Sequence, residues 1–530
     1  MVTTVTMAHP VSSLGQSEKL RIHNSDSLPG FRVLVGGIVF ACLPVSTLAA
    51  EWDATARLHL SEIYTDNLRL AVDDEEHESI TQINPGFSLT GRGARVRVGA
   101  DYTMQNLFYA HNPDSNTTHH QLRAWEQSEL IKDWFYFDSS ASISQQLVSP
   151  SERVSVDNLN LTGNRSDVVT FQVEPYIKRD LGAYATTELR YSHGWVDYEA
   201  DGVSDTQSST ASGYIANGYG ATHLFWRLAH REQREIRDDA ADSTRSSTTG
   251  MMRYRVLSTL SLIGYAGREE NDIQSNRPSP DGTYWSAGFR WHPSPKLSLE
   301  ATKGRNEEQA HLQWSPITRT AIDISYRDRD VGLNTSETWN GTLSHRTRRS
   351  TWALSYTEEV TNDQFLALQG QEAGFLVDSQ GQVSSDPNTG EPAIGFRDVF
   401  GLSNQEFLRT RAQLSMNYRS GKSTVSLSVY DETRTYELSA AELETKGGSA
   451  SWNWRFAART SSRISVQGQR YEALNSSDPG QTVKTSLSLA RQLSPRTNAR
   501  VEVSHLDGEE VGTQAKYDEN RVSLHLNMNF

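Results

Sequence analysis

The sequence of 530 residues has a single cysteine, Cys42, and only 16 prolines. The chain after Cys42 therefore has neither disulfide bonds nor a thiolate metal site. Scarce proline and an ordinary charged fraction of 22% argue against a disordered chain. A helical membrane protein is excluded as well, because the mean hydropathy is −0.59 and no apolar run approaches the roughly 20 residues that a spanning helix needs.

The chain also lacks an excess of positive charge. Its 51 basic residues are outnumbered by 65 acidic ones, and the formal net charge is −14. A nucleic-acid partner would need a basic face, so we expect none.

The common signatures of metalloproteases, phosphate-binding loops and acyl-enzyme hydrolases are missing. His119 and His120 form the only adjacent histidine pair, and we interpret them as residues of a solvated loop. Ser192 and His193 show no spacing that demands a catalytic triad. We therefore expect no enzyme, no bound metal and no cofactor.

The first fifty residues have the layout of an export signal. Arg32 precedes a short apolar run, and the mostly small residues Thr47–Ala50 come before a charged residue. This pattern predicts a leader with a cleavable signal peptide over 1–50, and a mature chain of 51–530. The alternative is a lipoprotein signal in which Cys42 is acylated.

The mature chain alternates between apolar and polar residues and shows almost no helical period. In 95–104 every even position is apolar or aromatic, and nearly every odd one is polar. Alternation places the apolar set on one face of a strand. The same pattern occupies 135–147, 169–177, 183–191, 414–418, 452–456 and 522–530. The chain is therefore expected to be all-β, although a soluble sandwich would show the same alternation.

The lengths of the connections favour one class of β protein. Short turns join strands at 179–182, 292–296, 315–319, 345–349, 419–422, 458–461 and 493–496. Longer polar segments lie between these hairpins, at 64–79, 148–167, 233–247, 268–283, 360–407 and 432–447. Short turns at one end and long loops at the other are typical of an outer-membrane β-barrel. We predict a single transmembrane antiparallel barrel of roughly 24 strands, between about 20 and 26, with both chain ends on the periplasmic side.

Aromatic residues mark both ends of the expected strands. At the short-turn end they are Trp291, Trp314, Tyr418 and Phe456, and before the long loops they are Tyr191, Tyr326 and Tyr356. Two aromatic belts around an apolar band are typical of the two membrane interfaces. Tyr265, Tyr430 and Tyr471 have similar positions but are one residue out of phase. The alternative is that these rings belong to the core of a soluble β protein.

The last ten residues alternate strictly, with apolar side chains at Leu524, Leu526, Met528 and the terminal Phe530. This ending is similar to the C-terminal signal that the barrel assembly machinery recognises. Its physical content is a closing strand with a lipid-facing stripe. We expect these four residues to form the assembly signal of a protein located in the bacterial outer membrane.

Charge is sorted between the two ends of the strands. The short turns are basic and contain Arg179, Lys296, Arg319, Arg348, Arg349, Arg459 and Arg496. The long loops are acidic and contain Asp73–Glu76, Glu78, Asp238, Asp239, Asp242, Glu269, Glu270, Asp272, Glu358, Glu359 and Asp363. We interpret the acidic loops as solvated, or as bridged by divalent cations to lipopolysaccharide phosphates. The alternative is a field along the pore, positive at its periplasmic mouth, that attracts an anionic polymer.

The segment 361–406 is the longest interruption of the hairpin pattern. It is either a surface loop or a constriction loop folded into the lumen. Its large apolar residues, among them Phe365, Leu366 and Phe375, are unusual for a solvated loop. We therefore favour a plug or a packed cap.

A set of short motifs runs along nearly the whole mature chain. They are Tyr64–Asn67, Asn84–Gly86 with Ser88–Gly91, Asp101–Tyr102, Trp134–Asp138 with Ser140–Gln146, Trp291–Lys296 and Leu493–Thr497. Together they resemble the outer-membrane protein family associated with the PEP-CTERM/exosortase system. The resemblance implies a Gram-negative outer-membrane barrel encoded with exopolysaccharide and exosortase genes, without catalytic residues.

Two hypotheses for the function follow from the barrel and the resemblance. The first is a porin-like channel that serves exopolysaccharide or exosortase-linked export across the outer membrane. The alternative is a non-conducting surface barrel that anchors exopolysaccharide or sorted proteins. The expected partners are outer-membrane lipid and lipopolysaccharide, the barrel assembly machinery, and exopolysaccharide with its periplasmic export components.

Overall fold

The computed structural model describes residues 51–149, 152–200, 203–238, 241–273, 280–333, 335, 337–368, 403, 405–473, 478–513 and 515–530. The predicted leader and signal peptide, with Cys42, lie outside the described residues, as does most of the predicted loop 361–406.

The described residues form one sheet of 24 antiparallel strands. The first twelve are β1 (Glu51–Thr65), β2 (Glu78–Arg92), β3 (Val96–Tyr109), β4 (Thr117–Ile131), β5 (Phe135–Leu147), β6 (Arg165–Leu181), β7 (Ala185–Tyr198), β8 (Thr206–Asn217), β9 (Leu224–Arg237), β10 (Ser243–Leu257), β11 (Leu260–Asp272) and β12 (Gly282–Ser294). The others are β13 (Leu297–Arg305), β14 (Glu307–Trp314), β15 (Thr320–Arg329), β16 (Glu337–Arg346), β17 (Ser350–Thr361), β18 (Phe407–Arg419), β19 (Ser423–Tyr436), β20 (Glu442–Ala457), β21 (Thr460–Ala473), β22 (Gly480–Ser494), β23 (Thr497–Glu509) and β24 (Lys516–Asn529). Two short helical segments, η2 (Pro113–Ser115) and α2 (Asp363–Leu368), lie in connections.

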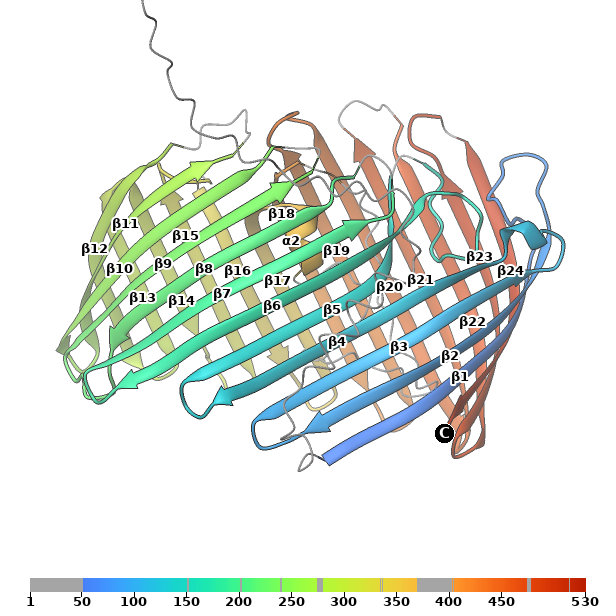
Figure 1. Cartoon of the computed structure of the whole chain (residues 1–530), viewed down its shortest axis with the longest axis horizontal. Helices are drawn as coiled ribbons and strands as arrows, with labels where there is room; N and C mark the ends of the chain where they lie inside the picture. The colour runs from blue at the N-terminus through green and yellow to red at the C-terminus, as the bar shows by residue number, and fades with distance from the viewer. Residues whose placement is uncertain are drawn as a thin grey trace, which may run out of the picture. The chain divides into compact units, whose positions relative to one another are not determined.

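Pairing of the first strand with the last closes the sheet into a barrel. Each strand pairs with its neighbours in sequence, and β1 also pairs with β24 from Arg57 opposite Asn529 to Thr65 opposite Arg521. The blue β1 and the red β24 lie side by side in Figure 1. The predicted all-β barrel and its strand number are thereby confirmed.

The two faces of the sheet differ in chemistry, as β24 shows. Val522 and Leu524 point outward and are more than half exposed, whereas Arg521, Ser523 and His525 point inward and are buried. The same alternation continues around the ring, with apolar side chains outside and polar ones inside. The outer surface therefore suits lipid, and the inner wall suits water and polar groups.

Most of the short connections lie at one end of the barrel, which we call the turn end. They join each even-numbered strand to the next, for example at 258–259 between β10 and β11. The start of β1 and the end of β24 lie at this end too, because Glu51 pairs with Arg92 and Asn529 with Arg57. The predicted position of the first and last strand ends on the short-turn side is confirmed, and that this side is periplasmic stays a prediction; we call the opposite end the loop end.

Several of the predicted long loops are shorter in the structure. Three of them are reduced to the connections 238–242, 273–281 and 437–441, because the flanking strands continue beyond the apolar band. Asn306 alone joins β13 to β14 with a φ of 60°, a left-handed conformation that asparagine tolerates. The polar sequence of these segments reflects strands that extend into water on both faces.

The three tyrosines that are out of phase with the belt face the lumen. Tyr430 and Tyr471 are buried on the inner wall. Each ring lies over a glycine of the neighbouring strand: a Cβ on Gly447 would approach the Tyr430 hydroxyl oxygen to 2.5 Å, and a Cβ on Gly480 would collide with the Tyr471 ring. Tyr265 donates its hydroxyl proton to Glu300 at 2.6 Å. Because they are one residue out of phase with the outward-facing belt, their side chains point into the lumen.

The closed barrel with an apolar exterior is an integral protein of the outer membrane. Only helices and closed barrels satisfy their backbone groups in lipid, and the ring of strands leaves no open edge. Among the described residues, no helix is long and apolar enough to cross a bilayer.

Leu354→Arg tests the orientation of the wall. Leu354 lies on the outer face between Trp352 and Tyr356, so a guanidinium there would face hydrocarbon. We expect the free energy of unfolding in phospholipid vesicles to fall by about 2–4 kcal/mol. Ser355→Arg, whose side chain points into the lumen, is the matched control and should change it by less than about 1 kcal/mol. Equal losses in the two variants would contradict the assigned faces.

Candidate functional site

The lumen is the candidate functional site, and its loop end is narrowed by the connection between β5 and β6. Of this segment, 148–149 and 152–164 are described. Val154 donates its backbone NH to the Tyr517 hydroxyl of β24 at 3.2 Å, and Leu159 accepts a hydrogen bond from the Tyr109 hydroxyl of β3. The segment therefore lies against strands on either side of the β1–β24 junction. We call it the β5–β6 loop.

Apolar contacts hold the β5–β6 loop against the inner wall. Leu159 packs with Ile63, Ile80 and Leu107, which point inward from the first three strands. Val154 packs with Tyr471. Burial of these side chains favours the inward position of the loop, since each large aliphatic group removed from water contributes roughly 1.5–3 kcal/mol.

A buried ion network locks the same loop to β24. Arg521 donates to Asp157 of the loop and to Glu519 of its own strand, both at 2.6 Å, and Asn160 accepts a third bond. Burial alone would raise the pKa of Asp157, but the charges of Arg521 and Lys484 outweigh it and hold this pKa well below its usual range. Asp157 is therefore ionised at neutral pH and serves as an electrostatic anchor of the loop.

The barrel wall is split between β4 and β5 at the loop end. The ladder between these strands stops at Leu122 and Ile143, although β5 continues to pair with β6 as far as Leu147. In place of the ladder, His119 contacts the Gln145 amide, and Asn158 of the β5–β6 loop donates to Gln145 at 2.6 Å. The loop thus completes the wall where the strands diverge.

The connection between β17 and β18 also enters the lumen. Its helix α2 packs through Ala367 on Val168 and Val196, which belong to β6 and β7. These strands lie ten or more positions from β17 around the ring, so the helix must reach across the interior. Figure 1 shows α2 within the barrel, near its loop end.

Buried charges fix this second loop at its beginning. Asp363, at the start of α2, accepts a hydrogen bond from Arg434 of β19 at 2.7 Å, and both side chains are 1% exposed. Glu432 neutralises the same guanidinium at 2.9 Å and also pairs with Arg409 and Arg411. An arginine at this depth is stable only when it is paired.

The end of the second loop is held in the same way. Glu406 pairs with Arg245 of β10 at 2.7 Å and lies 3.5 Å from Arg237 of β9. Asn362, next to Asp363, donates to Glu235 of β9. The described ends of the segment 361–406 are therefore anchored to strands far apart on the ring; the rest of the predicted plug or cap lies outside the described residues.

Some of the acidic residues interpreted as solvated loop groups instead pair with arginines, and two of them are largely buried. Glu269 pairs with Arg329 at 2.9 Å, Glu359 with Arg409 at 3.3 Å, and Asp363 with Arg434. That interpretation is wrong for Glu269 and Asp363, whose side chains are 14% and 1% exposed inside the barrel, whereas Glu359 remains 38% exposed beside Arg409. Sequence parity could have identified Glu269 and Glu359, which share the polar phase of their strands.

One side of the lumen is lined by hydroxyl groups. The serine row consists of residues that lie opposite one another on β19 to β23, namely Ser426, Ser451, Ser465, Ser486 and Ser504. Asn417 extends the row to β18 and donates to Ser426 at 3.1 Å. Ser428 and Ser449 form part of a second row beside it. The row itself offers weak hydrogen-bonding groups, and the charged residues Arg463 and Lys484 lie one inward position to either side of it.

The opposite side of the lumen is cationic at the turn end. A recess of about 550 Å³ is lined there by Arg253, Arg255, Arg290, His292 and Lys296. Its arginines lie on β10 and β12, about ten positions from the serine row in the ring of 24 and thus across the lumen from it, and the rest of the lining extends to β16. No local pattern singles out these three arginines, because they lie within β10 and β12 and not in the basic turns.

The predicted belt residues all point outward. Trp291, Trp314 and Phe456 are about two-fifths exposed at the turn ends of their strands, where Tyr418 also lies. Tyr191, Tyr326 and Tyr356 lie midway along their strands, each at the seventh position. The strands thus continue well beyond the outer set of tyrosines. Trp452 and Trp454, stacked beside Phe456, add to the turn-end set.

The other predicted residues are also placed by the structure. The basic residues Arg179, Lys296, Arg319, Arg348, Arg349, Arg459 and Arg496 all lie at the turn end, and Leu524, Leu526, Met528 and Phe530 all lie on the outer side of the closing strand. Their roles in charge steering and assembly remain predictions.

The adjacent histidine pair lies in a strand and not in the predicted solvated loop. His119 and His120 belong to β4 rather than to a loop, and they contact different partners, Gln145 and Tyr102. Ser192 bonds to Gln172 and His193 to Ser209, on opposite faces of β7. Within the described residues there is no cluster of three or more metal-ligating side chains.

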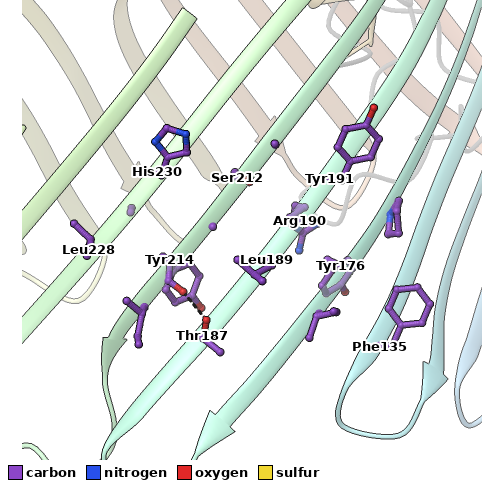
Figure 2. A pocket seen from close by; sticks show the side chains of 16 residues that line it. Phe135, Tyr176, Thr187, Leu189, Arg190, Tyr191, Ser212, Tyr214, Leu228 and His230 are labelled. Atoms are coloured by element: carbon purple, nitrogen blue, oxygen red, sulfur yellow. Dashed lines mark hydrogen bonds between the residues drawn. The ribbon is translucent and has the colours of Figure 1, made fainter. Parts of the chain in front are cut away.

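A recess of about 650 Å³ lies on the outer surface over β8 (Figure 2). Its lining includes the small residues Ala211 and Gly213 of β8, and Leu189, Tyr191 and Leu228 come from the two neighbouring strands (Figure 2). Leu189 and Leu228 are more than half exposed on the outer face. In the membrane this recess is filled by acyl chains, so it is not part of the lumen site.

No family model matches this chain, and no curated protein matches it. Among solved structures, it is similar to the FrpB iron transporter from Neisseria meningitidis, with 12% identity, a TM-score of 0.45 and coverage of 90% of this chain and 83% of that one. It is also similar to a ferric enterobactin receptor (PfeA) mutant from Pseudomonas aeruginosa, with 10% identity, a TM-score of 0.43 and coverage of 90% and 80%. A loop-deletion mutant of OmpT, an outer membrane protein of Vibrio cholerae, is 8% identical with a TM-score of 0.33 and coverage of 91% and 100%.

Asp157→Asn tests the anchor of the β5–β6 loop. Removal of one carboxylate from the buried Arg521 should lower the free energy of unfolding by about 3 kcal/mol at pH 7. The pKa of Asp157 is depressed, so its contribution is complete above the ordinary aspartate pKa and is lost as the pH falls through the lower folded value. The difference between wild type and variant, measured by denaturant titration, should therefore be constant from pH 7 to 5 and shrink only under stronger acid.

The exposed Asp114 of η2 supplies the control, since Asp114→Asn should change stability by less than about 0.5 kcal/mol. A difference that already disappears near pH 6 would contradict the depressed pKa of Asp157.

Proposed function

We propose that this barrel is a conduit for an exopolysaccharide of an exosortase-associated system, and that the two inward loops narrow its outer mouth. The resemblance of the short motifs to the PEP-CTERM/exosortase-associated family supports a role in this system. The hydroxyl groups of the inner wall support a polysaccharide as the solute.

The serine row is the observation that carries this proposal. A polysaccharide presents hydroxyl groups along its whole length, and a wall of hydroxyls can exchange hydrogen bonds with each of them in turn. Each such bond contributes only about 0.5–1.5 kcal/mol in exchange with water, so a chain could move along the wall without being held. The paired hydroxyls of Ser465 and Ser486, 2.7 Å apart, show that these groups are close enough to act as a continuous surface.

The second candidate function is a non-conducting barrel that anchors polysaccharide at the cell surface. It is favoured by the two loops, since the contacts of Asp157 and Asp363 hold them across the loop end of the lumen. In this case the polymer would bind outside the barrel and never enter it.

Deletion of the gene separates these functions when polysaccharide is measured in the medium, on the cell surface and in the periplasm. A conduit predicts accumulation in the periplasm with loss from both outer fractions. An anchor predicts unchanged total secretion with polymer shed from the surface into the medium. Unchanged amounts in all three fractions would contradict both functions.

The triple variant Ser451→Leu, Ser465→Leu and Ser486→Leu tests the wall itself. Loss of its hydroxyls should reduce exported polysaccharide several-fold in the complemented deletion strain, because the wall no longer exchanges hydrogen bonds with the chain. The triple Ser→Thr variant keeps the hydroxyls and should export normally. A change of gel mobility on heating checks that both variants form folded barrels. Normal export by the folded leucine variant would contradict the proposed role of the wall.

A further inference from the structure

Three arginines come together on the inner wall at the turn end. Arg255 of β10 and Arg290 of β12 both lie opposite Ser261 of the intervening β11, so the small Ser261 separates two long cationic side chains. Arg253 lies one inward position further along β10, in a row with Ile263 and Gly288. We call Arg253, Arg255 and Arg290 the arginine triad.

The triad opens into the recess of about 550 Å³ on the cationic wall. Ser261 is 3% exposed and Gly288 has no side chain, so neither fills the space between the guanidinium groups. His292 and Lys296 add basic groups at the turn-end rim. The recess is therefore a space bounded by donors on several sides.

An aromatic ring keeps two of the guanidinium groups in place. Arg253 and Arg255 both lie over Phe225 of β9, with their guanidinium carbons 4.5 and 5.2 Å from the ring centre. Stacking on a ring leaves the in-plane NH groups of an arginine free to bind a planar oxyanion. The two side chains are thus oriented before any ligand arrives.

The acids nearest to the triad are already engaged. Asp323 accepts hydrogen bonds from His311 and Gln313, both at 3.0 Å. Glu300 accepts the Tyr265 hydroxyl proton, and its other oxygen lies 4.0 Å from Arg290. Arg253 and Arg255 have no ion-pair partner among the residues that the structure describes.

The arginines at the two ends of the lumen therefore differ in their number of carboxylate partners. At the loop end Arg434 and Arg521 are each bonded to two carboxylates, as a buried structural arginine requires. At the turn end the triad has one distant carboxylate for three guanidinium groups. Three like charges placed this close are stable where water or a ligand anion compensates them.

We propose that the arginine triad is a binding site for the oxyanion groups of an acidic polysaccharide. The triad would hold the carboxylates or phosphates of the polymer while its hydroxyls face the serine row. This inference deepens the proposed conduit function and rests on it for the polymer. A site of three arginines also requires the polymer to be anionic, whereas the serine row alone would accept a neutral one.

Isothermal titration of the full detergent-solubilised barrel tests the site without requiring transport. Oligogalacturonate and inorganic tripolyphosphate are titrated separately at low ionic strength, since carboxylated and phosphorylated polymers share this oxyanion chemistry. The variant Arg253→Gln, Arg255→Gln and Arg290→Gln should bind the preferred probe roughly tenfold or more weakly, because it loses the charge-assisted hydrogen bonds.

The matched control removes the same charge from the outer surface. Arg234, Arg268 and Arg470 lie toward the loop end, and their side chains are more than half exposed. The triple Arg→Gln variant at these positions should bind like wild type. Equal affinity in all three proteins, or no binding of either probe by wild type, would overturn the site.

Reversal potentials in a KCl gradient distinguish this inference from the conduit proposal. A conducting barrel should prefer chloride over potassium and lose that preference in the triad variant but not in the control. Current without anion preference and without probe binding contradicts the site and leaves the conduit in place. Probe binding without any current supports the site and contradicts the conduit.

Discussion

The closure of β1 on β24 is the constraint on which the rest of the structure depends. Hydrocarbon offers no partner for a backbone NH or carbonyl group, so each strand must find both of its neighbours within the sheet. Once the ring is closed, the two-residue period assigns every side chain to lipid or to lumen. The apolar exterior and the polar interior are consequences of this single arrangement.

Because burial of an unpaired charge is unfavourable, the two ends of the lumen differ in how their arginines are compensated. At the loop end two connections fold inward, and Arg521 and Arg434 accompany them only because Asp157 and Asp363 arrive on the loops themselves. At the turn end no connection enters among the described residues, and the arginine triad is left beside an open recess. The lumen is thus narrowed and lined by ion pairs toward one side of the membrane, and cationic toward the other.

Sequence patterns were sufficient for the wall of the barrel. The alternation and the short turns predict the strand number, the position of both chain ends, and the outward orientation of Trp314 and Tyr356, because each depends on residues adjacent in the chain. Tyr430 is one residue out of phase with the belt, and the structure shows that this phase turns its ring inward, over Gly447.

The site could not be predicted in the same way, because its contacts join residues that are distant in sequence. Asp157 meets Arg521 across 364 positions, and no local pattern marks either residue as a partner of the other. The acidic composition of these segments therefore predicted solvated carboxylates, whereas Glu269 and Asp363 form largely buried ion pairs in the structure. The arginine triad was missed for a related reason, since Arg255 and Arg290 become neighbours only through the register of β10, β11 and β12.

Single-channel conductance in a planar bilayer tests most directly whether the lumen is a water-filled path narrowed by its docked loops. The measurement compares the full barrel with the double variant Asp157→Asn and Asp363→Asn, which releases one anchor of each loop. The account predicts a small ohmic current for wild type and a larger one for the variant. A variant that folds normally and remains as silent or as conductive as wild type would contradict it.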